Sequence, residues 1–233
     1  MTLKVISFDL DDTFWPILPV VLRAEKLSNK WLIENYPAIE PLLTREEMYQ
    51  IRCELISKDS SLSFQLSKLR SLILSEIAKR AGYKERESEQ IAEKSFEIFF
   101  KARNEVNLYD GVQECLKKIK KIYSLGVITN GNADLKIIGL DHFFDFNISA
   151  ADAEASKPDQ KIFKQAIKIS GAEPHEICHV GDHPINDVQG SLEAGMKAIW
   201  FNEKRITWPL GGVKGHQEIN SWNELERVLD SIT

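Results

Sequence analysis

The residues of this sequence best suited to chemistry lie in four short segments that are far apart along the chain. They are two aspartates near the N-terminus, a threonine followed by an asparagine and a glycine, one lysine, and a second pair of aspartates: Asp9 and Asp11; Thr129, Asn130 and Gly131; Lys157; Asp182 and Asp187. Carboxylates crowded into one cleft repel one another unless a cation or protons compensate them. Oxygen ligands of this kind suit Mg²⁺, which proteins hold through one or two carboxylates, waters and substrate phosphate. We therefore predict that these segments meet and bind Mg²⁺ together with a phosphate.

The first two aspartates are spaced so that both can reach one reacting centre. At the end of a strand, alternate side chains share a face, which places the carboxylates of Asp9 and Asp11 on the same side. One carboxylate must stay ionised to attack phosphorus, while the other donates a proton to the leaving oxygen and later accepts one from water. A metal ion close to Asp9 would keep its pKa low, so we expect Asp11 to carry the proton.

The other polar residues suit the binding of anionic oxygens. Lys157 supplies positive charge, and Thr129 supplies a hydroxyl donor, for the oxygens of a phosphoryl group. Backbone N–H groups of the turn at Asn130 and Gly131 can form a small anion-binding nest. These residue types favour phosphoryl transfer to a carboxylate nucleophile.

The elements that must position these residues alternate between strands and helices over the second half of the chain. The patterns predict strands over 5–8, 124–129, 146–149, 177–180 and 197–201, and helices over 112–122, 134–138, 159–170 and 187–194, with a capped helix opening at Ser221. This alternation predicts a parallel sheet with helices on both faces and ligands at the carboxyl ends of the strands. The four segments lie at or just beyond such ends.

The chain changes character between the first and second predicted strands. Apolar residues recur at three- and four-residue spacing over 20–35, 45–58, 63–81 and 86–105, which predicts a helical bundle. Pro16 and Pro19 predict an irregular segment over 14–19. We therefore expect an α/β fold: a Rossmann-like, doubly wound parallel sheet core with an inserted helical-bundle cap. The core would comprise residues 1–17 and 107–233, and the cap residues 18–106.

In order and spacing, these segments resemble the four motifs of the haloacid dehalogenase (HAD) superfamily, and the insert resembles its type-one helical cap. The matching residues are Phe8–Thr13, Ile128–Gly131, Lys157-Pro158 and Gly181–Asp187. The resemblance implies that Asp9 is the nucleophile, which forms an aspartyl-phosphate, and that Asp11 is the general acid and base. It also implies that Mg²⁺ is bound by Asp9, the backbone carbonyl of Asp11, and Asp182. Thr129 and Lys157 would hold the phosphoryl group, and Asp187 would orient Lys157 or an outer water.

A closer likeness within the superfamily is to bacterial phosphatases of the riboflavin pathway, which act on 5-amino-6-(5-phospho-D-ribitylamino)uracil and FMN. It rests on Val21–Glu25, Glu34–Ala38, Thr129–Ala133 and Ser156–Pro158. For such planar bases, Trp15 is a candidate stacking surface. Arg23, Arg70 and Arg103 of the insert are candidates for binding the polar tail of a substrate, although each is also typical of a solvated or helix-pairing arginine.

Two other functions are compatible with these residues. The first is metal-free 2-haloacid dehalogenation, which also uses an aspartate nucleophile. It is disfavoured because a metal-free site contains no ion for Asp11 and Asp182 to bind, and because dehalogenases typically carry an aromatic residue at position 11. The second is a phospho-aspartate signalling or binding protein, which needs no helical cap over its site.

Composition excludes several classes of protein. The 233 residues are 43% hydrophobic, which is typical of a globular protein and excludes a disordered or fibrous chain. The net charge of −5 indicates no basic surface for binding nucleic acid and no polybasic patch for binding a membrane. The apolar stretch 15–22 contains two prolines and is far shorter than the roughly 20 residues that span a bilayer. Cys53, Cys115 and Cys178 are spaced too widely for a zinc site and are expected to be reduced core residues. We expect a cytoplasmic enzyme with Mg²⁺ as cofactor and a small-molecule phosphate ester as partner, either a monomer or a small homo-oligomer.

Overall fold

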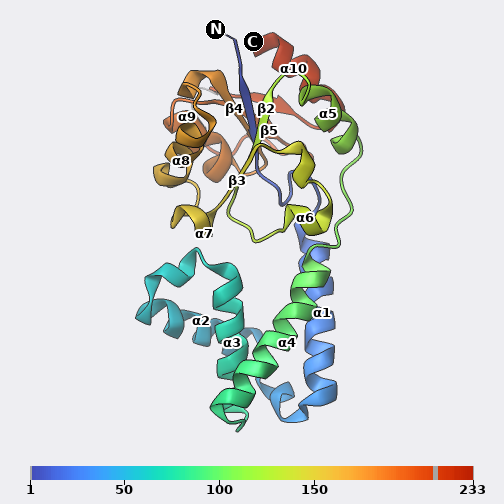
Figure 1. Cartoon of the computed structure of the whole chain (residues 1–233), viewed down its shortest axis with the longest axis vertical. Helices are drawn as coiled ribbons and strands as arrows, with labels where there is room; N and C mark the ends of the chain where they lie inside the picture. Colours follow the sequence, from blue (N-terminus) through green and yellow to red (C-terminus); the bar gives the residue numbers. More distant parts are fainter. Residues whose placement is uncertain (1, 212–214, 233) are drawn as a thin grey trace. The chain divides into compact units, whose positions relative to one another are not determined.

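The computed structural model describes residues 2–211 and 215–232, and the chain divides into two compact units. The core unit comprises Met1–Pro16 and Asn107–Thr233, and the helical unit comprises Ile17–Val106. A six-stranded sheet with the order β3-β2-β1-β4-β5-β6 runs through the core unit, and all of its strand pairs are parallel (Figure 1). This arrangement confirms the predicted α/β class with a doubly wound parallel sheet.

The strands of the sheet are short, and the central ones are buried. They are β1 (Val5–Phe8), β2 (Ser124–Thr129), β3 (Phe146–Ser149), β4 (Ile177–Gly181), β5 (Lys197–Phe201) and β6 (Gln217–Ile219). In the middle of the sheet, Phe8 is in register with Val127 on one side and Val180 on the other. This register brings the carboxyl ends of β1, β2 and β4 to one edge, where the segments carrying Asp9, Thr129 and Asp182 begin or end.

Helices cover both faces of the sheet, with α5 (Val112–Ile119) and α10 (Leu225–Ile232) on one side and α8 (Gln160–Ser170) and α9 (Gly190–Glu193) on the other (Figure 1). The shorter helical segments are α6 (Leu135–Ile138), α7 (Ala150–Ala153), η3 (Asp141–Phe143), η4 (Pro174–Glu176), η5 (Pro184–Gln189) and η6 (Trp222–Glu224). The helix predicted over 187–194 begins earlier, because η5 is a π-helical turn whose first N–H groups are capped by the His183 ring. The edge strand β6 was not predicted, since three residues are too few to show a period.

An aromatic cluster holds the segment that follows β1. The ring of Phe14 packs edge-to-face on Phe8 and Trp222, with centroid distances of 5.5 and 4.8 Å. The Trp222 indole also donates a hydrogen bond of 3.0 Å to the carbonyl of Thr13. Fully burying an aromatic side chain contributes about 1.5–3 kcal/mol, so this cluster fixes the loop that carries the first two aspartates.

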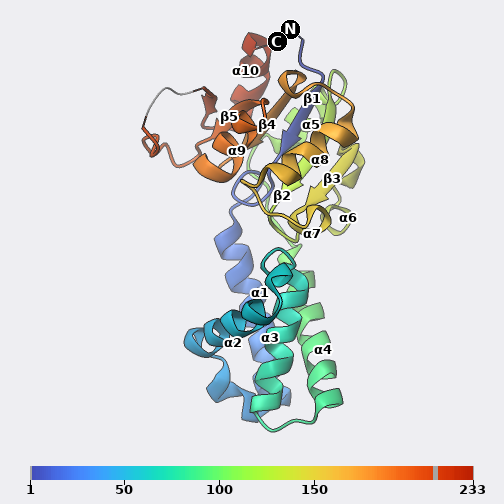
Figure 2. The ribbon, with the colours of Figure 1, turned by 90° about the vertical axis from the view of Figure 1, so that its left-hand side faces the viewer.

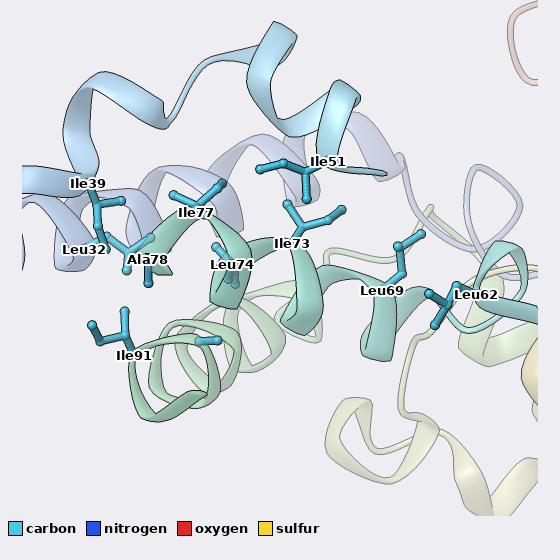
Figure 3. Packing of buried hydrophobic residues seen from close by; sticks show 11 residues of the cluster. Leu32, Ile39, Ile51, Leu62, Leu69, Ile73, Leu74, Ile77, Ala78 and Ile91 are labelled. Carbon is cyan, nitrogen blue, oxygen red and sulfur yellow. The ribbon is translucent and has the colours of Figure 1, made fainter. Parts of the chain in front are cut away.

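The helical unit contains α1 (Ile17–Asn35), η1 (Pro37–Leu42), α2 (Arg45–Lys58), η2 (Ser60–Ser63), α3 (Leu66–Arg80) and α4 (Glu85–Arg103) (Figure 2). It has an apolar core of its own, in which Ile73 and Ile77 of α3 face Ile51 of α2 (Figure 3). Ile91 of α4 contributes to the same buried cluster. The unit therefore stabilises itself through its own packing.

Two sequence-based expectations were wrong. The segment 14–19 is not wholly irregular, since α1 begins at Ile17 and Pro19 is its third residue. A proline is tolerated there because N–H groups in the first turn of a helix have no helical acceptor to lose. The second wrong expectation concerns Cys53, which was predicted to lie in the core but is exposed. Cys115 and Cys178 are buried as expected, and all three cysteines are free thiols.

Among the described residues, no helix is both long and apolar enough to cross a membrane.

Candidate active site

A tight turn after β1 presents the first two aspartates. The N–H of Asp9 continues the sheet by donating to Val180 O at 2.9 Å. Asp12 then adopts a left-handed conformation, with φ of 58°, and its N–H donates to Trp15 O at 2.8 Å. The chain thus reverses within a few residues of the strand, which keeps both Asp9 and Asp11 at the carboxyl edge of the sheet.

A pocket of about 190 Å³ lies at this edge, entirely within the core unit. Its lining residues come from the segments after β1, β2 and β4 and from the turn before α8: Asp9, Asp11, Asp12, Thr129, Asn130, Gly131, Lys157, Asp182, His183, Asn186 and Asp187. Every site residue predicted within the core unit lines this pocket except Trp15. Segments nearly 180 positions apart therefore meet because parallel strands end at one edge.

Lys157 lies at the centre of a buried ion-pair cluster. Its Nζ donates to Asp9 Oδ1 at 2.7 Å, to Asp187 Oδ1 at 2.6 Å and to the carbonyl of Ile128 at 2.7 Å. The Lys157 side chain is only 1% exposed. Burial opposes its charge, but the carboxylates of Asp187 and Asp9 raise the pKa of Lys157 above its usual value. The ammonium group is therefore a fixed positive charge beside Asp9.

Negative charge in the pocket exceeds what this lysine compensates. Carboxylate oxygens of Asp9, Asp182 and Asp187 lie within 4.8 Å of one another. The pKa of Asp9 is raised to about 7, because burial outweighs the attraction of Lys157. The pKa of Asp182 is raised to about 8 by burial and by the carboxylates of Asp187 and Asp9. A crowded, all-oxygen donor set with this excess charge fits a hard divalent cation such as Mg²⁺.

Asp187 is held by a network behind the pocket. Its Oδ2 accepts the N–H of His183 at 2.9 Å, and its Oδ1 lies 3.4 Å from His179 Nε2. Burial alone would raise the pKa of Asp187, but Lys157 and His179 lower it below its usual range. The backbone also requires a glycine at 181, because a Cβ there would lie 2.3 Å from the Asp187 carboxyl carbon. Asp187 therefore stays ionised and orients Lys157.

The segment after β2 contributes one hydroxyl and one structural clamp. The Thr129 Oγ1 accepts the N–H of Gly131 at 3.0 Å, which tightens the turn. The Asn130 side chain accepts the N–H of Lys157 at 2.7 Å and donates to the Lys157 carbonyl at 3.0 Å. Its amide group therefore positions the lysine backbone, a role that the sequence pattern did not reveal.

Trp15 departs from its predicted role. The side chain is 0% exposed, and it is absent from the pocket lining, so it presents no face on which a substrate base could stack. Packing against Phe14 buries the ring, with centroids 6.2 Å apart. Its indole Nε1 instead donates to Asp11 Oδ1 at 3.0 Å. No motif signalled this contact, because it depends on the turn at Asp12.

Two arginines of the helical unit are occupied by neighbours within that unit. Arg23 donates to the carbonyls of Ala102 and Glu105. Arg70 pairs with Glu25 at 2.9 Å, and its guanidinium lies 3.7 Å from the centroid of the Phe99 ring. Arg103 is buried. These contacts indicate structural roles for Arg23 and Arg70.

A doubly wound parallel sheet with a carboxylate-lined pocket at its carboxyl edge is typical of an α/β enzyme that acts on small ligands. More specifically, the chain belongs to the haloacid dehalogenase-like hydrolase family, whose sequence model matches residues 45–201. The fold, the order of the motifs and the family match agree, so the protein is a hydrolase of this family.

Curated relatives and a solved structure give finer comparisons. The chain is 28% identical to the 5-amino-6-(5-phospho-D-ribitylamino)uracil phosphatase YigB of Escherichia coli, over 85% of this chain and 83% of YigB. It is 28% identical to the phosphoserine phosphatase of Thermus thermophilus, over 86% of this chain and 89% of that protein. A crystal structure described as a 2-haloacid dehalogenase from Pseudomonas syringae superposes with a TM-score of 0.96 at 36% identity and covers 100% of both chains.

Proposed function

We propose that the protein is a Mg²⁺-dependent phosphomonoesterase that works through an aspartyl-phosphate on Asp9. The observation that carries this proposal is the crowded pocket in which Asp9, Asp182 and Asp187 face one buried ammonium group. A dianionic phosphoryl group could not enter such a pocket without further positive charge. A site built in this way suits a phosphate that arrives with a divalent cation.

In the first step, an Asp9 carboxylate oxygen attacks phosphorus, and the bond from phosphorus to the ester oxygen breaks. Asp11 donates a proton to that oxygen, so the leaving group departs as a neutral alcohol. In the second step, Asp11 takes a proton from water, whose oxygen attacks phosphorus and displaces Asp9. The products are the alcohol and inorganic phosphate, and both aspartates return to their starting states.

The other pocket residues bind and orient the phosphoryl group. Lys157 lies next to Asp9 and neutralises phosphoryl oxygens, while the Thr129 hydroxyl donates a hydrogen bond to them. Mg²⁺, when bound, would be held by Asp9, Asp182 and the backbone carbonyl of Asp11, and would neutralise charge on the phosphoryl oxygens. Asp187 keeps Lys157 in place.

We further propose that the helical unit acts as a cap and that the substrate is a small phosphate ester of the riboflavin pathway. The similarity to YigB, which covers most of both chains, supports 5-amino-6-(5-phospho-D-ribitylamino)uracil or FMN as the substrate. An enclosed site would exclude all but the reacting water. A cytoplasmic enzyme acting as a monomer or small homo-oligomer accords with this role.

Metal-free 2-haloacid dehalogenation is the second candidate, because the solved relative from Pseudomonas syringae carries that description. In that reaction, Asp9 would attack the carbon that bears the halogen, and halide would leave without needing a proton. This reaction is disfavoured because it needs neither a proton donor at Asp11 nor a cation to compensate the negative charge around Asp182.

The deciding experiment measures both activities on the same purified protein. Phosphate release from p-nitrophenyl phosphate is assayed with Mg²⁺ and again after treatment with EDTA, and chloride release from 2-chloropropionate is assayed under both conditions. We expect phosphatase activity that EDTA abolishes and added Mg²⁺ restores, with no chloride release. Chloride release that survives EDTA, without phosphatase activity, would reject the proposal in favour of the dehalogenase.

The substrate is tested by ranking kcat/KM over a panel of phosphates. The panel contains FMN, the ribitylaminouracil phosphate, phosphoserine, sugar phosphates and nucleotides. We expect the two flavin-pathway phosphates to rank highest. If they rank no better than the others, the specific substrate is withdrawn, while the phosphatase assignment stands.

A further inference from the structure

We propose that the buried indole N–H of Trp15 positions the Asp11 carboxyl group for proton transfer. This inference rests on the proposed phosphatase function and assigns a positioning residue to it. The indole Nε1 lies 3.0 Å from Asp11 Oδ1, and the Trp15 side chain is completely buried. Asp11 itself is partly exposed and lines the pocket. A buried, rigid donor therefore holds one oxygen of the Asp11 carboxyl group.

The backbone of the turn makes this contact rigid. Asp11 and Trp15 form an isolated parallel β-bridge, and the N–H of Asp12 donates to Trp15 O at 2.8 Å. Next to Trp15, Phe14 is anchored on Trp222 and Phe8. Neither ring nor backbone of Trp15 can move without disturbing this aromatic cluster. Catalytic groups must be held to within a fraction of an ångström, and this turn supplies the support.

The acceptor distinguishes Trp15 from two other buried tryptophans. Trp200 donates to the backbone carbonyl of Asp182 at 2.7 Å, and Trp222 donates to the carbonyl of Thr13 at 3.0 Å. Those contacts satisfy a buried N–H with a neutral main-chain acceptor, which is the ordinary solution. Trp15 instead donates to a side-chain carboxylate that lines the pocket. Hydrogen bonds to an ionised group are roughly twice as strong as neutral ones.

The chemistry of the donor also decides which oxygen of Asp11 takes part in the reaction. An indole N–H only donates, so Oδ1 must act as an acceptor whether or not the carboxyl group is protonated. Because the indole hydrogen bond makes Oδ1 the less basic oxygen, the proposal places on Oδ2 the proton that passes to the leaving oxygen and later comes from water. Trp15 thus orients the acid without exchanging a proton itself.

The test uses Trp15→Phe, which keeps a buried aromatic ring and removes the N–H. The substrates are aryl phosphates of similar size whose leaving groups differ in acidity, from phenyl phosphate to 2,4-dinitrophenyl phosphate. The parameter is kcat/KM, which covers the steps up to departure of the leaving group. An acid matters most for a poor leaving group, because a good one leaves without protonation.

We expect a steeper dependence on leaving-group acidity in the variant. For phenyl phosphate, kcat/KM should fall by roughly 10- to 100-fold, the range of a lost hydrogen bond to a charged group. For 2,4-dinitrophenyl phosphate it should fall by less than about threefold, since little protonation is needed. In an Asp11→Asn background, Trp15→Phe should have little further effect on either substrate, because the acid is already absent.

Trp222→Phe is the matched control, because it removes a buried indole hydrogen bond whose acceptor lies outside the pocket lining. It should lower stability and, because Trp222 supports the loop through Phe14 and Thr13, any loss of kcat/KM should be equal for all the aryl phosphates, so that the leaving-group dependence stays as in the wild type. If Trp15→Phe fails to fold, 3-benzothienylalanine at position 15 replaces it, because sulfur takes the place of the N–H in a ring of the same shape.

The outcomes separate this inference from the proposed function. An active wild type with an unchanged leaving-group dependence in the Trp15 variant overturns the positioning role and leaves the phosphatase assignment intact. Equal losses on all aryl phosphates would also overturn it, since they indicate general structural damage. A wild type that hydrolyses no aryl phosphate with Mg²⁺ removes both proposals together.

Discussion

The core unit and the helical unit differ in where their acidic and basic side chains pair. In the core unit, Lys157 and Asp187 have side chains that are 1% and 2% exposed, and carboxylates outnumber the ammonium group. In the helical unit, Arg80 contacts Glu47, Glu54 and Glu76 near the surface, where each partner remains partly exposed. Exposed pairs contribute little and need no further ligand, whereas uncompensated buried charge requires one. The contrast locates chemistry in the core unit and structural packing in the helical unit.

The largest expected effect comes from Asp9→Asn, which removes the proposed nucleophile and keeps the shape of the side chain. Turnover should fall by roughly 10⁴-fold or more, the scale of losses on removing a nucleophile. Stability should hold or increase, because a buried carboxylate whose pKa is raised to about 7 becomes neutral. Initial rates with p-nitrophenyl phosphate and a thermal melt check both statements. Substantial turnover in this variant would reject Asp9 as the nucleophile.

Lys157→Met should damage activity and stability together. It leaves Asp9 and Asp187 buried without their shared partner, and breaking a buried ion pair from one side costs about 3–5 kcal/mol. Activity should fall by roughly 10³-fold, as expected for the loss of a preorganised charge. Denaturant unfolding and steady-state kinetics give the two readouts. Lys161→Met, at an exposed pair with Glu154, is the control and should change neither by a measurable amount.

Ile91→Ala tests the helical unit alone. Ile91 is fully buried in that unit, so its truncation should lower the free energy of unfolding by about 2–5 kcal/mol. Rates with p-nitrophenyl phosphate, measured well below the melting temperature, should remain close to wild type, because all pocket residues belong to the core unit. Leu27→Ala, at an exposed site on α1, is the matched control. A large loss of turnover in folded Ile91→Ala would break the division between the two units.

Metal removal should make stability depend on pH in a defined direction. The pKa of Asp182 is raised from 3.8 to about 8 in the fold, so the folded state binds protons more tightly than the unfolded chain. Stability of the metal-free protein should therefore decrease as pH rises from about 5 to 8, and excess Mg²⁺ should reduce that decrease. Melting temperatures in EDTA and in Mg²⁺ across this range provide the measurement. A melting temperature in EDTA that is flat or rising would contradict the electrostatic account.

The smallest effect is expected from Arg70→Met. The Arg70–Glu25 pair is partly exposed, so its loss should cost no more than about 1 kcal/mol. The apolar stem of methionine can replace part of the contact with Phe99. Unfolding free energy and KM for the flavin-pathway phosphates are the two readouts. A selective rise in KM without loss of stability would show that Arg70 contacts substrate, contrary to the structural role described above.

How well the sequence predicted the molecule depended on the range of the interactions involved. Strands such as 124–129 and 197–201 could be located because burial on both faces leaves a continuous apolar run. The convergence of Asp9, Thr129, Lys157 and Asp182 followed from one rule of parallel-sheet topology. Predicting these features required only the local residue pattern and the order of the strands.

The features that were missed depend on backbone geometry or on pairwise contacts. The donation of Trp15 to Asp11 arises within the turn at the left-handed Asp12, and the predicted stacking role of Trp15 fails because its ring is buried. The clamp of Asn130 on the Lys157 backbone joins two loops whose spacing carries no signal. The π-helical start of η5 depends on a side-chain cap. No periodic pattern encodes such contacts.

The order of the strands has a consequence for how the chain is made. β1 occupies the middle of the sheet, yet both of its neighbours, β2 and β4, are encoded after the whole helical unit. At translation speeds of about 5–20 residues per second, several seconds pass between the synthesis of β1 and that of β2. The helical unit, with its own apolar core, can fold during that interval, so the core unit is completed last.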